Sequence, residues 1–519
     1  MFKLLWAGPS SACFELENKA PYRSPEPYSV WLDGEERLRG ETNVFSLFGL
    51  FPGKTYEVEL RMGGASGKLR FTTRTEPCAL DVREFGAAGD GETDDTAAIQ
   101  RAILLLPAGG RLVFPRGVYR TGALFLRSHM TLELTEGAVL LGLTEKSAYP
   151  VLPAAVPDRN GGEAMNPGTF EGLDRDMYAA LLTAYYAEDI TLVGPGRVDG
   201  NAQNGTWWRD FKQDPVARPR LCFLNRCRGV VLHGIEAANS ASWQLHPYQS
   251  EEISFYDVSV SAPKDSPNTD ALDPESCDRV AIVGCRFSVG DDCIAVKSGK
   301  LDKALSGTGR PATNHTIRNC LMAFGHGAVV LGSEISCGVR DLSVTQCEFR
   351  QTDRGLRIKT RRGRGEQCQI EGVTFENIRM EGVLTPIVIN CYYRCVDPDG
   401  DSDYVQSREP QPVDVRTPRL GDFVFRNMDC RGTEVAGCFI DGLPERPIGS
   451  VTLEHIRMDY KPDAKPGVPS MYTNAPQRCR MGLYFNQVGA VTLRDVTLSG
   501  ADGDEVILSG VGSFRREEY

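Results

Sequence analysis

The chain has 519 residues, of which 41% are hydrophobic and 24% charged, with 54 glycines and a formal net charge of -11. This composition is typical of a globular β protein with many turns, and it excludes a disordered or collagen-like chain. The negative charge disfavours nucleic acid and anionic membranes as partners, because long-range repulsion opposes both encounters. A polyanionic substrate would meet the same repulsion, so it would require a local basic pocket.

The sequence carries no signal for export. Its first residues, MFKLLWAGPSS, lack the apolar stretch of a secretory signal, and no later apolar run reaches transmembrane length. We therefore expect a cytoplasmic location. The sixteen cysteines are scattered without the paired spacing of a metal site, so we expect reduced structural thiols.

Residues 1 to 77 contain short runs in which apolar and polar residues alternate, such as SVWLDG, TYEVELRM and KLRFTTRT. This alternation predicts strands with one buried face, and we expect a small β-sandwich over residues 1 to 77. The stretch LFPGKTY, which ends at Tyr56, resembles the tyrosine corner of fibronectin type III domains, in which the tyrosine hydroxyl bonds back to the backbone. An irregular β extension of the main domain is the alternative.

After Pro77 the pattern changes, and a strand and a glycine-rich turn precede a predicted helix whose start is marked by Thr93, Asp94 and Asp95. We expect this helix to cover the open end of a repetitive β domain. Its expected apolar face consists of Ala97, Ile99, Ala102, Ile103 and Leu104.

From about residue 110 onward, β-branched units such as EDITLVGPGRVDG, RGVVLHGIEAANS and EEISFYDVSVSAP recur. Val230, Ile253 and Val280 hold equivalent places and lie 23 and 27 residues apart (253 - 230 and 280 - 253). This period fits one coil of a parallel β-solenoid. We therefore predict an all-β protein in which residues 78 to 519 form a parallel β-helix.

Two stretches break the repeat. Residues 147 to 178 and 392 to 418 are long loops, and loops of this length are usually functional or disordered. The basic run Arg361 to Arg364 is either a further contact for carboxylates or a solvated turn.

Four successive repeats carry a different polar group at the same place. They read SPNTDALDPES, SVGDDCIAVKS, AFGHGAVVLGS and QTDRGLRIKT, and each is a turn followed by an apolar strand that ends in Ser or Thr. Asp270 and Asp292 each lie six places before the serine that ends their repeat. Asp291 and His326 each lie seven places before the serine that ends theirs. Equal offsets in a solenoid predict side chains stacked in space.

The same register predicts a basic pocket beside the carboxylates. Arg357 and Lys359 lie three places and one place before Thr360, and alternation along a strand puts both on one face. Lys297 shares the offset of Lys359, so we expect it to add charge to the floor of the same cleft.

The four motifs match in order and spacing those of the polygalacturonase family of glycoside hydrolases, family 28, and the chain resembles that family over most of residues 78 to 519. With its N-terminal sandwich it is most like bacterial exo-polygalacturonases that carry a fibronectin type III-like domain. The resemblance implies a right-handed parallel β-helix of the pectin-lyase-like type and an inverting hydrolase that uses no metal or other cofactor. The motifs are Asn268-Thr269-Asp270, Gly290-Asp291-Asp292, Gly325-His326-Gly327 and Arg357-Ile358-Lys359.

The resemblance implies roles for four residues in the reaction. Asp291 resembles the general acid, Asp270 and Asp292 resemble the bases that hold the attacking water, and His326 is expected beside the acid. Inversion calls for acid and base carboxyls roughly 6.5 to 9.5 Å apart, and groups on adjacent coils should lie near that spacing. Repulsion among three carboxylates should raise the pKa of one of them.

The resemblance also implies four substrate-binding residues. Arg357 and Lys359 would bind a sugar carboxylate, Asn268 belongs to the first motif, and Tyr393 resembles a tyrosine that lines the substrate subsite. The adjacent Tyr392 leaves the choice between the two tyrosines open.

We therefore predict hydrolysis of α-1,4-galacturonosyl linkages in galacturonan, pectin or oligogalacturonides. Intracellular action and two long loops favour the release of terminal units, which is exo action. The sequence does not determine the oligomeric state. Three alternatives remain, namely a calcium-dependent pectate lyase that acts by β-elimination, a rhamnogalacturonan hydrolase, and a β-solenoid that binds polysaccharide without catalysis.

Overall fold

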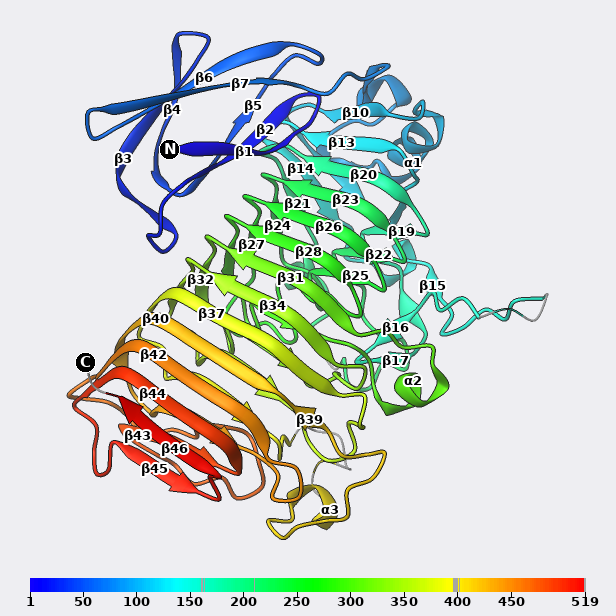
Figure 1. Ribbon diagram of the computed structural model, residues 1–519. Helices are drawn as coiled ribbons and strands as arrows, with labels where there is room; N and C mark the ends of the chain where they lie inside the picture. The colour runs from blue at the N-terminus through cyan, green and yellow to red at the C-terminus, as the bar shows by residue number, and fades with distance from the viewer. Residues whose placement is uncertain (160–161, 163, 210, 395–399, 401, 518–519) are drawn as a thin grey trace.

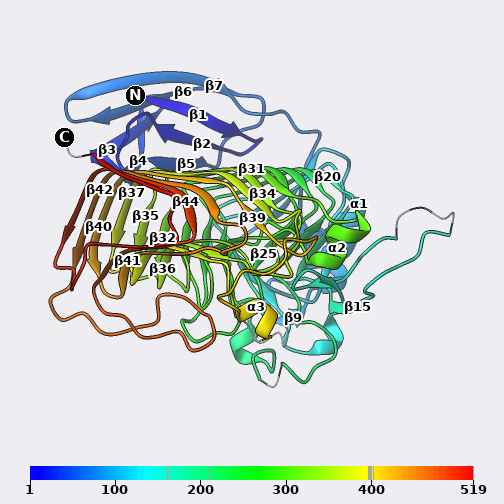
Figure 2. The same ribbon diagram turned by 60° about the horizontal axis from the view of Figure 1, so that its bottom comes forward.

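The computed structural model describes residues 1–159, 162, 164–209, 211–394, 400 and 402–517. A small antiparallel β-sandwich packs along one side of a long parallel β-helix (Figures 1 and 2). The predicted all-β class, with a parallel β-helix and an N-terminal β-sandwich, is confirmed. The last sandwich strand ends at Thr72 and the first strand of the β-helix begins at Ala79, while the boundary at residue 77 stays a prediction.

The N-terminal sandwich consists of a three-stranded and a four-stranded antiparallel sheet. The N–H of Phe51 donates to the hydroxyl of Tyr56 at 2.8 Å, so the predicted tyrosine corner forms. The first sheet contains β1 (Phe2–Ala7), β2 (Ser11–Leu16) and β5 (Val44–Phe48), and the second contains β4 (Glu35–Thr42), β3 (Arg23–Leu32), β6 (Thr55–Met62) and β7 (Ala65–Thr72).

The coils of the β-helix stack their strands in parallel. The sheet that faces the sandwich contains β8 (Ala79–Asp81), β10 (Gly110–Phe114), β13 (Met130–Leu134), β20 (Glu188–Val193), β23 (Arg228–His233), β26 (Glu251–Tyr256), β28 (Asp278–Val283), β31 (Ala312–Arg318), β34 (Val339–Thr345), β37 (Gln369–Glu381), β39 (Arg419–Leu420), β40 (Asp422–Thr433), β42 (Ile448–Tyr460), β44 (Val488–Ser499) and β46 (Ser513–Glu517). A row of short strands continues it, with β9 (Asp90–Asp94), β11 (Gly117–Thr121), β14 (Ala138–Gly142), β21 (Arg197–Asp199), β24 (Glu236–Ala238), β27 (Ser259–Ser261), β29 (Arg286–Ser288), β32 (Leu321–Phe324) and β35 (Glu348–Arg350).

A further row of parallel strands carries the four motifs, and we call it the motif sheet. Its N-terminal part contains β12 (Leu124–Phe125), β19 (Leu182–Tyr185), β22 (Cys222–Asn225) and β25 (Leu245–Tyr248). Bridges through Leu272 join it to β30 (Ile294–Val296), β33 (Val329–Gly332), β36 (Arg354–Lys359), β38 (Thr385–Asn390), β41 (Ala436–Asp441), β43 (Met481–Asn486) and β45 (Val506–Ser509).

Aliphatic side chains fill the interior of the coils. Val230 pairs in register with Ile253, and Ile253 pairs with Val280, as the repeat length predicts. All three side chains are buried in one continuous core that runs through the β-helix. Burial of one such side chain contributes roughly 1.5 to 3 kcal/mol, so the repeated core is the main stabilising element of the fold.

The predicted helix is α1 (Thr96–Leu105), with Asp95 at its N-cap. Its buried face joins the core at the N-terminal end of the β-helix, where Figure 1 shows α1 beside the first coils. The face differs from the prediction, because Ala97 and Leu104 are exposed and Ala98 is buried in their place. Two further short helices are α2 (Leu301–Ser306) and α3 (Asp403–Gln406), and the 3-10 turns are Val82–Phe85, Lys146–Ala148 and Ala202–Asn204.

The described part of the loop at residues 147 to 178 forms short antiparallel strands. They are β15 (Val151–Leu152), β16 (Thr169–Phe170), β17 (Leu173–Asp174) and β18 (Met177–Tyr178). Fifteen cysteines are described and all are unpaired, while Cys395 lies outside the described residues. None of the helices described is both long and apolar enough to cross a membrane.

The sandwich binds equivalent turns of successive coils. Ser11 and Ser46 bond to His233 and Asp257, at the ends of β23 and β26, and Asn43 bonds to Asn319 after β31. Contacts at one repeated position on several coils explain why the sandwich lies along the axis of the β-helix in Figure 2.

The strongest of these contacts belongs to Glu15, whose side chain is only 3% exposed and accepts hydrogen bonds from Arg318 at 2.5 and 3.0 Å and from Asn319 at 2.7 Å. Burial alone would raise the pKa of Glu15, but the Arg318 guanidinium outweighs burial and lowers it. Because the folded pKa is lowered, the stabilisation is present above the unfolded value of about 4.3 and is lost as the pH falls.

We expect Glu15→Ala to lower the free energy of unfolding by roughly 2 to 4 kcal/mol at neutral pH, because it removes one partner of a largely buried ion pair. Urea unfolding of the full chain measures this change. Glu17→Ala is the matched control, since Glu17 is 54% exposed and pairs only with the N-terminal amine, so its removal should change the stability much less. Equal losses in both variants would contradict an anchoring role for Glu15.

Candidate active site

The structure brings the predicted carboxylates together on neighbouring coils. Leu272 bridges Ile294, which pairs in register with Val329 on the next coil. Asp270 lies two places before Leu272, and Asp292 lies two places before Ile294. The two aspartates therefore occupy equivalent positions, as their shared offset predicts.

Asp291 and His326 are a second equivalent pair, each three places before the paired residues Ile294 and Val329. The N–H of His326 donates to the backbone carbonyl of Asp291 at 2.9 Å, and its Nδ1 lies 3.4 Å from a carboxylate oxygen of Asp291. This contact with Asp291 raises the pKa of His326. His326 therefore lies beside the predicted acid, with half of its side chain exposed.

The three carboxylates form one compact cluster. One oxygen of each lies within 4.8 Å of an oxygen of both others. Asp270 and Asp292 are buried, while the side chain of Asp291 is 23% exposed. The separation of acid and base carboxyl groups that inversion calls for stays a prediction, because the 4.8 Å joins only the nearest oxygens of the three side chains.

Asp292 lies between two cations. Lys359 donates to its Oδ2 at 2.8 Å, and Nη1 of Arg357 lies 3.4 Å from its Oδ1. Burial alone would raise the pKa of Asp292, but the charges of Lys359 and Arg357 outweigh it and hold the pKa below the usual aspartate range. Asp292 is therefore an ionised carboxylate near neutral pH and can accept a proton from water.

Asp270 has the opposite electrostatic environment. Burial raises its pKa well above the ordinary value, and the nearby charges of Asp273 and Asp291 raise it further. One member of the trio thus has a raised pKa, but burial and Asp273 contribute more to the rise than repulsion within the trio does. That member is Asp270, which the family resemblance assigns as a base, and not the predicted acid.

The positions of the two candidate tyrosines are resolved by the structure. Nζ of Lys359 and the guanidinium carbon of Arg357 lie 5.7 and 5.9 Å from the ring centroid of Tyr393. The ring of Tyr392 instead lies 3.7 Å from the guanidinium carbon of Arg408. Tyr393 therefore lies beside the predicted substrate-binding cations and Tyr392 does not.

Lys297 does not supply free charge to the cleft, so this expectation was wrong. Its side chain is 4% exposed and its Nζ lies 3.5 Å from Asp273 and 3.3 Å from Glu334. Trp243 covers it, with the ring centroid 4.4 Å from the Nζ. The register placed Lys297 on the correct face, but the segments that cover that face bury it.

Arg362, in the basic run after β36, is neither part of a solvated turn nor a contact for the substrate. This side chain is fully buried, pairs with Glu445 at 2.7 Å, and donates to the carbonyl of Ser407 at 2.7 Å. Arg362 therefore anchors the described part of the loop at residues 392 to 418.

Two buried arginines that the sequence analysis missed support the site. Nη2 of Arg218 donates to the side-chain oxygen of Asn268 at 2.7 Å, which fixes this predicted substrate-binding residue. Arg220 lies 4.4 Å from the ring centroid of Trp243 and is fully buried. Their alternating spacing before β22 is the sequence signal that both side chains share one face.

The hairpin of β16 and β17 packs over this N-terminal end of the site. Phe170 stacks on Trp243 with 5.7 Å between ring centroids, and Arg220 donates to the carbonyl of Thr169 at 3.3 Å. Asp174 pairs with Lys303 of α2 at 2.5 Å. Figure 1 shows β16 and β17 next to α2, so the described part of this loop is an ordered cover.

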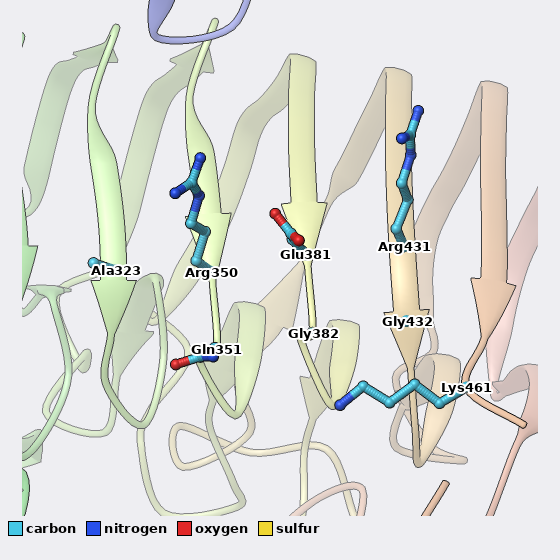
Figure 3. Close-up of a pocket in the computed structure, with 8 residues that line it drawn as sticks. All are labelled: Ala323, Arg350, Gln351, Glu381, Gly382, Arg431, Gly432 and Lys461. Carbon is cyan, nitrogen blue, oxygen red and sulfur yellow. The ribbon is translucent and has the colours of Figure 1, made fainter. Parts of the chain in front are cut away.

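A cavity of about 560 Å³ lies away from the carboxylates, along β35, β37 and β40 (Figure 3). Arg350 pairs in register with Glu381, and Glu381 pairs with Arg431. Arg431 also bonds to Asp429 at 2.8 Å, and Lys461 bonds to Glu434 at 2.5 Å. These cations are neutralised by neighbours, so the cavity is a weak candidate for an anionic ligand.

Comparison with known proteins identifies two matching families. The family Glycosyl hydrolases family 28 matches residues 169–407, which include all four motifs. The family Rhamnogalacturonase A/epimerase, pectate lyase-like matches residues 79–142 at the start of the β-helix.

Individual relatives agree with the first match. The chain is 33% identical over 394 residues to a probable polygalacturonase of Vitis vinifera, covering 74% of each chain. It is 26% identical over 439 residues to the exo-poly-alpha-D-galacturonosidase of Dickeya chrysanthemi, covering 73% of this chain and 68% of that protein. The fold is similar to that of the family 28 exopolygalacturonase of Yersinia enterocolitica, with a TM-score of 0.71, 19% identity and 98% of both chains covered. The chain belongs to family 28 of the glycosyl hydrolases.

Proposed function

We propose that this enzyme hydrolyses α-1,4-galacturonosyl linkages of galacturonan or oligogalacturonides. The observation that carries the proposal is the ionised Asp292, which Lys359 and Arg357 hold within 4.8 Å of two further carboxylates. The cations, together with Tyr393, form the local basic pocket that a polyanionic substrate requires of an acidic chain.

The proposed reaction divides the work among the three aspartates. Asp291, the most exposed of them, protonates the glycosidic oxygen as the bond to the anomeric carbon breaks. Asp292 accepts a proton from a water molecule, whose oxygen bonds to that carbon, and Asp270 holds the same water. The products are two shorter sugars, and the catalytic proton has passed from Asp291 to the leaving group while Asp292 has gained one from water. The sugar carboxylate binds Arg357 through its planar fork and Lys359 as a point charge.

The exo mode is a separate part of the proposal. The hairpin of β16 and β17 covers the motif sheet beside β25, on the N-terminal side of the carboxylates, through Phe170 on Trp243. A covered end would stop a polymer from lying across the catalytic centre in both directions, so one terminus would enter. The Dickeya chrysanthemi relative carries an exo activity in its name, which supports this mode.

We further propose a cytoplasmic location, where imported oligomers would be the substrate. The fifteen cysteines in the described part of the chain support it, since all of them are unpaired and disulfides are rare in that compartment.

We expect Asp291→Asn to lower kcat by about a hundredfold to ten-thousandfold, because the amide has the same shape but cannot donate the proton. Release of reducing ends from polygalacturonate measures the rate. Asp265→Asn is the control, since Asp265 is an exposed residue of the turn before the first motif. A wild type that binds polygalacturonate and never releases reducing ends would instead support a non-catalytic β-solenoid.

The pKa shifts predict a displaced pH profile of kcat/KM. Because its pKa is lowered, Asp292 stays deprotonated and remains a base at acid pH. Because its pKa is raised, Asp270 keeps its proton to a higher pH. We therefore expect the alkaline limb to lie above the ordinary aspartate pKa of about 3.9 and to move in Asp270→Asn. An unchanged limb in that variant would show that another group sets it.

Exo hydrolysis predicts galacturonate monomer as the first product and a slow loss of viscosity. Chromatography of early time points, with the anomeric form recorded by NMR, measures mode and stereochemistry together, and we expect inversion. The digestion should proceed unchanged in the presence of a chelator and without the ultraviolet absorbance of an unsaturated product. A ladder of mid-sized oligomers would disprove exo action, and chelator sensitivity with absorbance would favour the lyase.

A further inference from the structure

A cavity of about 380 Å³ lies on the same sheet as the catalytic carboxylates, toward the C-terminal coils. This volume is in the range of small-ligand sites. Three tyrosines and several polar groups line it, among them Tyr392, Tyr472, Tyr484, Arg408, Asp441 and Asn486. We call it the tyrosine pocket.

The strand register connects the tyrosine pocket to the catalytic centre. Lys359 pairs with Asn390, Asn390 pairs with Asp441, and Asp441 pairs with Asn486. Residues paired in parallel strands point to the same face, so this polar row runs outward along the motif sheet from Lys359. Asp441 lies two strand spacings from Lys359, a distance of about 10 Å.

The tyrosine pocket combines aromatic rings with a guanidinium. Tyr484 and Tyr472 both stack with Phe439, with 5.0 and 6.0 Å between ring centroids. Arg408 has a 43% exposed side chain and donates to both oxygens of the buried Asp441, at 2.9 and 2.7 Å, through Nη1. Among the described residues no hydrogen bond uses its Nε or Nη2, so these donors remain for a ligand.

A single turn of the chain, which contains Met471, separates the catalytic centre from the tyrosine pocket. The sulfur of Met471 lies 2.9 Å from Nη2 of Arg357. The backbone carbonyl of Met471 accepts a hydrogen bond from the side chain of Asn390 at 2.9 Å. The next residue, Tyr472, lines the tyrosine pocket. Met471 is 44% exposed, so the ridge between the sites presents an apolar surface that a sugar chain can cross.

We propose that the tyrosine pocket binds a further galacturonate unit of the same substrate chain, beyond the two units that flank the scissile bond. The distance of about 10 Å from Lys359 places the pocket beyond the reacting sugar. The tyrosine rings contact the apolar face of the pyranose, and the free donors of Arg408 bind its carboxylate. The inference rests on the proposed function, because it takes the substrate to be a galacturonan chain.

The test compares substrates of two lengths. Tyr484→Leu removes the ring and hydroxyl from β43 without touching a residue of the catalytic centre. We expect the ratio of kcat/KM for a long oligogalacturonide to that for digalacturonate to fall about five- to tenfold, the scale of one lost aromatic contact. Arg408→Gln combined with Asp441→Asn should lower the same ratio, and this pair of changes leaves no buried charge unpaired.

Trp31→Leu is the matched control, because it likewise replaces a half-buried aromatic strand residue by leucine, but in the sandwich, where Trp31 packs against Arg61. In Trp31→Leu, the ratio of kcat/KM for the long oligogalacturonide to that for digalacturonate should equal that of the wild type. Calorimetry with the long oligomer in an Asp291→Asn background should show weaker binding when Tyr484→Leu is added.

The outcomes separate the inference from the function on which it rests. A wild type without activity on either substrate would refute the proposed function. An active wild type whose length ratio is unchanged in both pocket variants would refute the inference alone. If the pocket variants differ from the wild type only after galacturonate monomer is added, the pocket holds released product. This outcome also overturns the inference.

Discussion

The in-register stacking of parallel strands is the constraint on which the site depends. Backbone hydrogen bonds between coils hold Leu272, Ile294 and Val329 at one level of the sheet, and every side chain at an equal offset from them is then stacked in space. A shift of one residue would turn the polar groups inward and the aliphatic residues outward. The buried core opposes such a shift, so the same packing that stabilises the β-helix also places the carboxylates.

Stacking at about 4.8 Å brings like charges together, and the site is stable because opposite charges are interleaved with them. Lys359 and Arg357 lie against Asp292, and Lys297 lies between Asp273 and Glu334. The two arrangements have different consequences. The first pair borders the carboxylate trio and keeps Asp292 ionised, while Lys297 is sealed beneath Trp243 and balances buried acids. Asp270 has no cation in hydrogen-bond contact among the described residues, and its pKa is raised.

The segments that interrupt the repeat determine which parts of the motif sheet a substrate can reach. Phe170 of the β16 and β17 hairpin covers the sheet on the N-terminal side of the carboxylates, and Met471 lies between the catalytic centre and the tyrosine pocket. The motif strands keep one register from coil to coil along the axis. We therefore expect differences in substrate length and mode to arise mainly from these insertions, because they cover the repeated face of the scaffold.

The sequence by itself determined the coil period, the shared offsets of Asp270, Asp291, Asp292 and His326, and the tyrosine corner, because these follow from local periodicity and from equal spacing in a solenoid. Burial and charge pairing were decided only by the tertiary structure. The covering of Lys297 by Trp243, the engagement of Asn268 by Arg218 and the choice of Tyr393 over Tyr392 depend on segments that are distant in the chain. The physical reason is that a repeat specifies which face a side chain occupies, whereas its solvation and pKa depend on what else packs on that face.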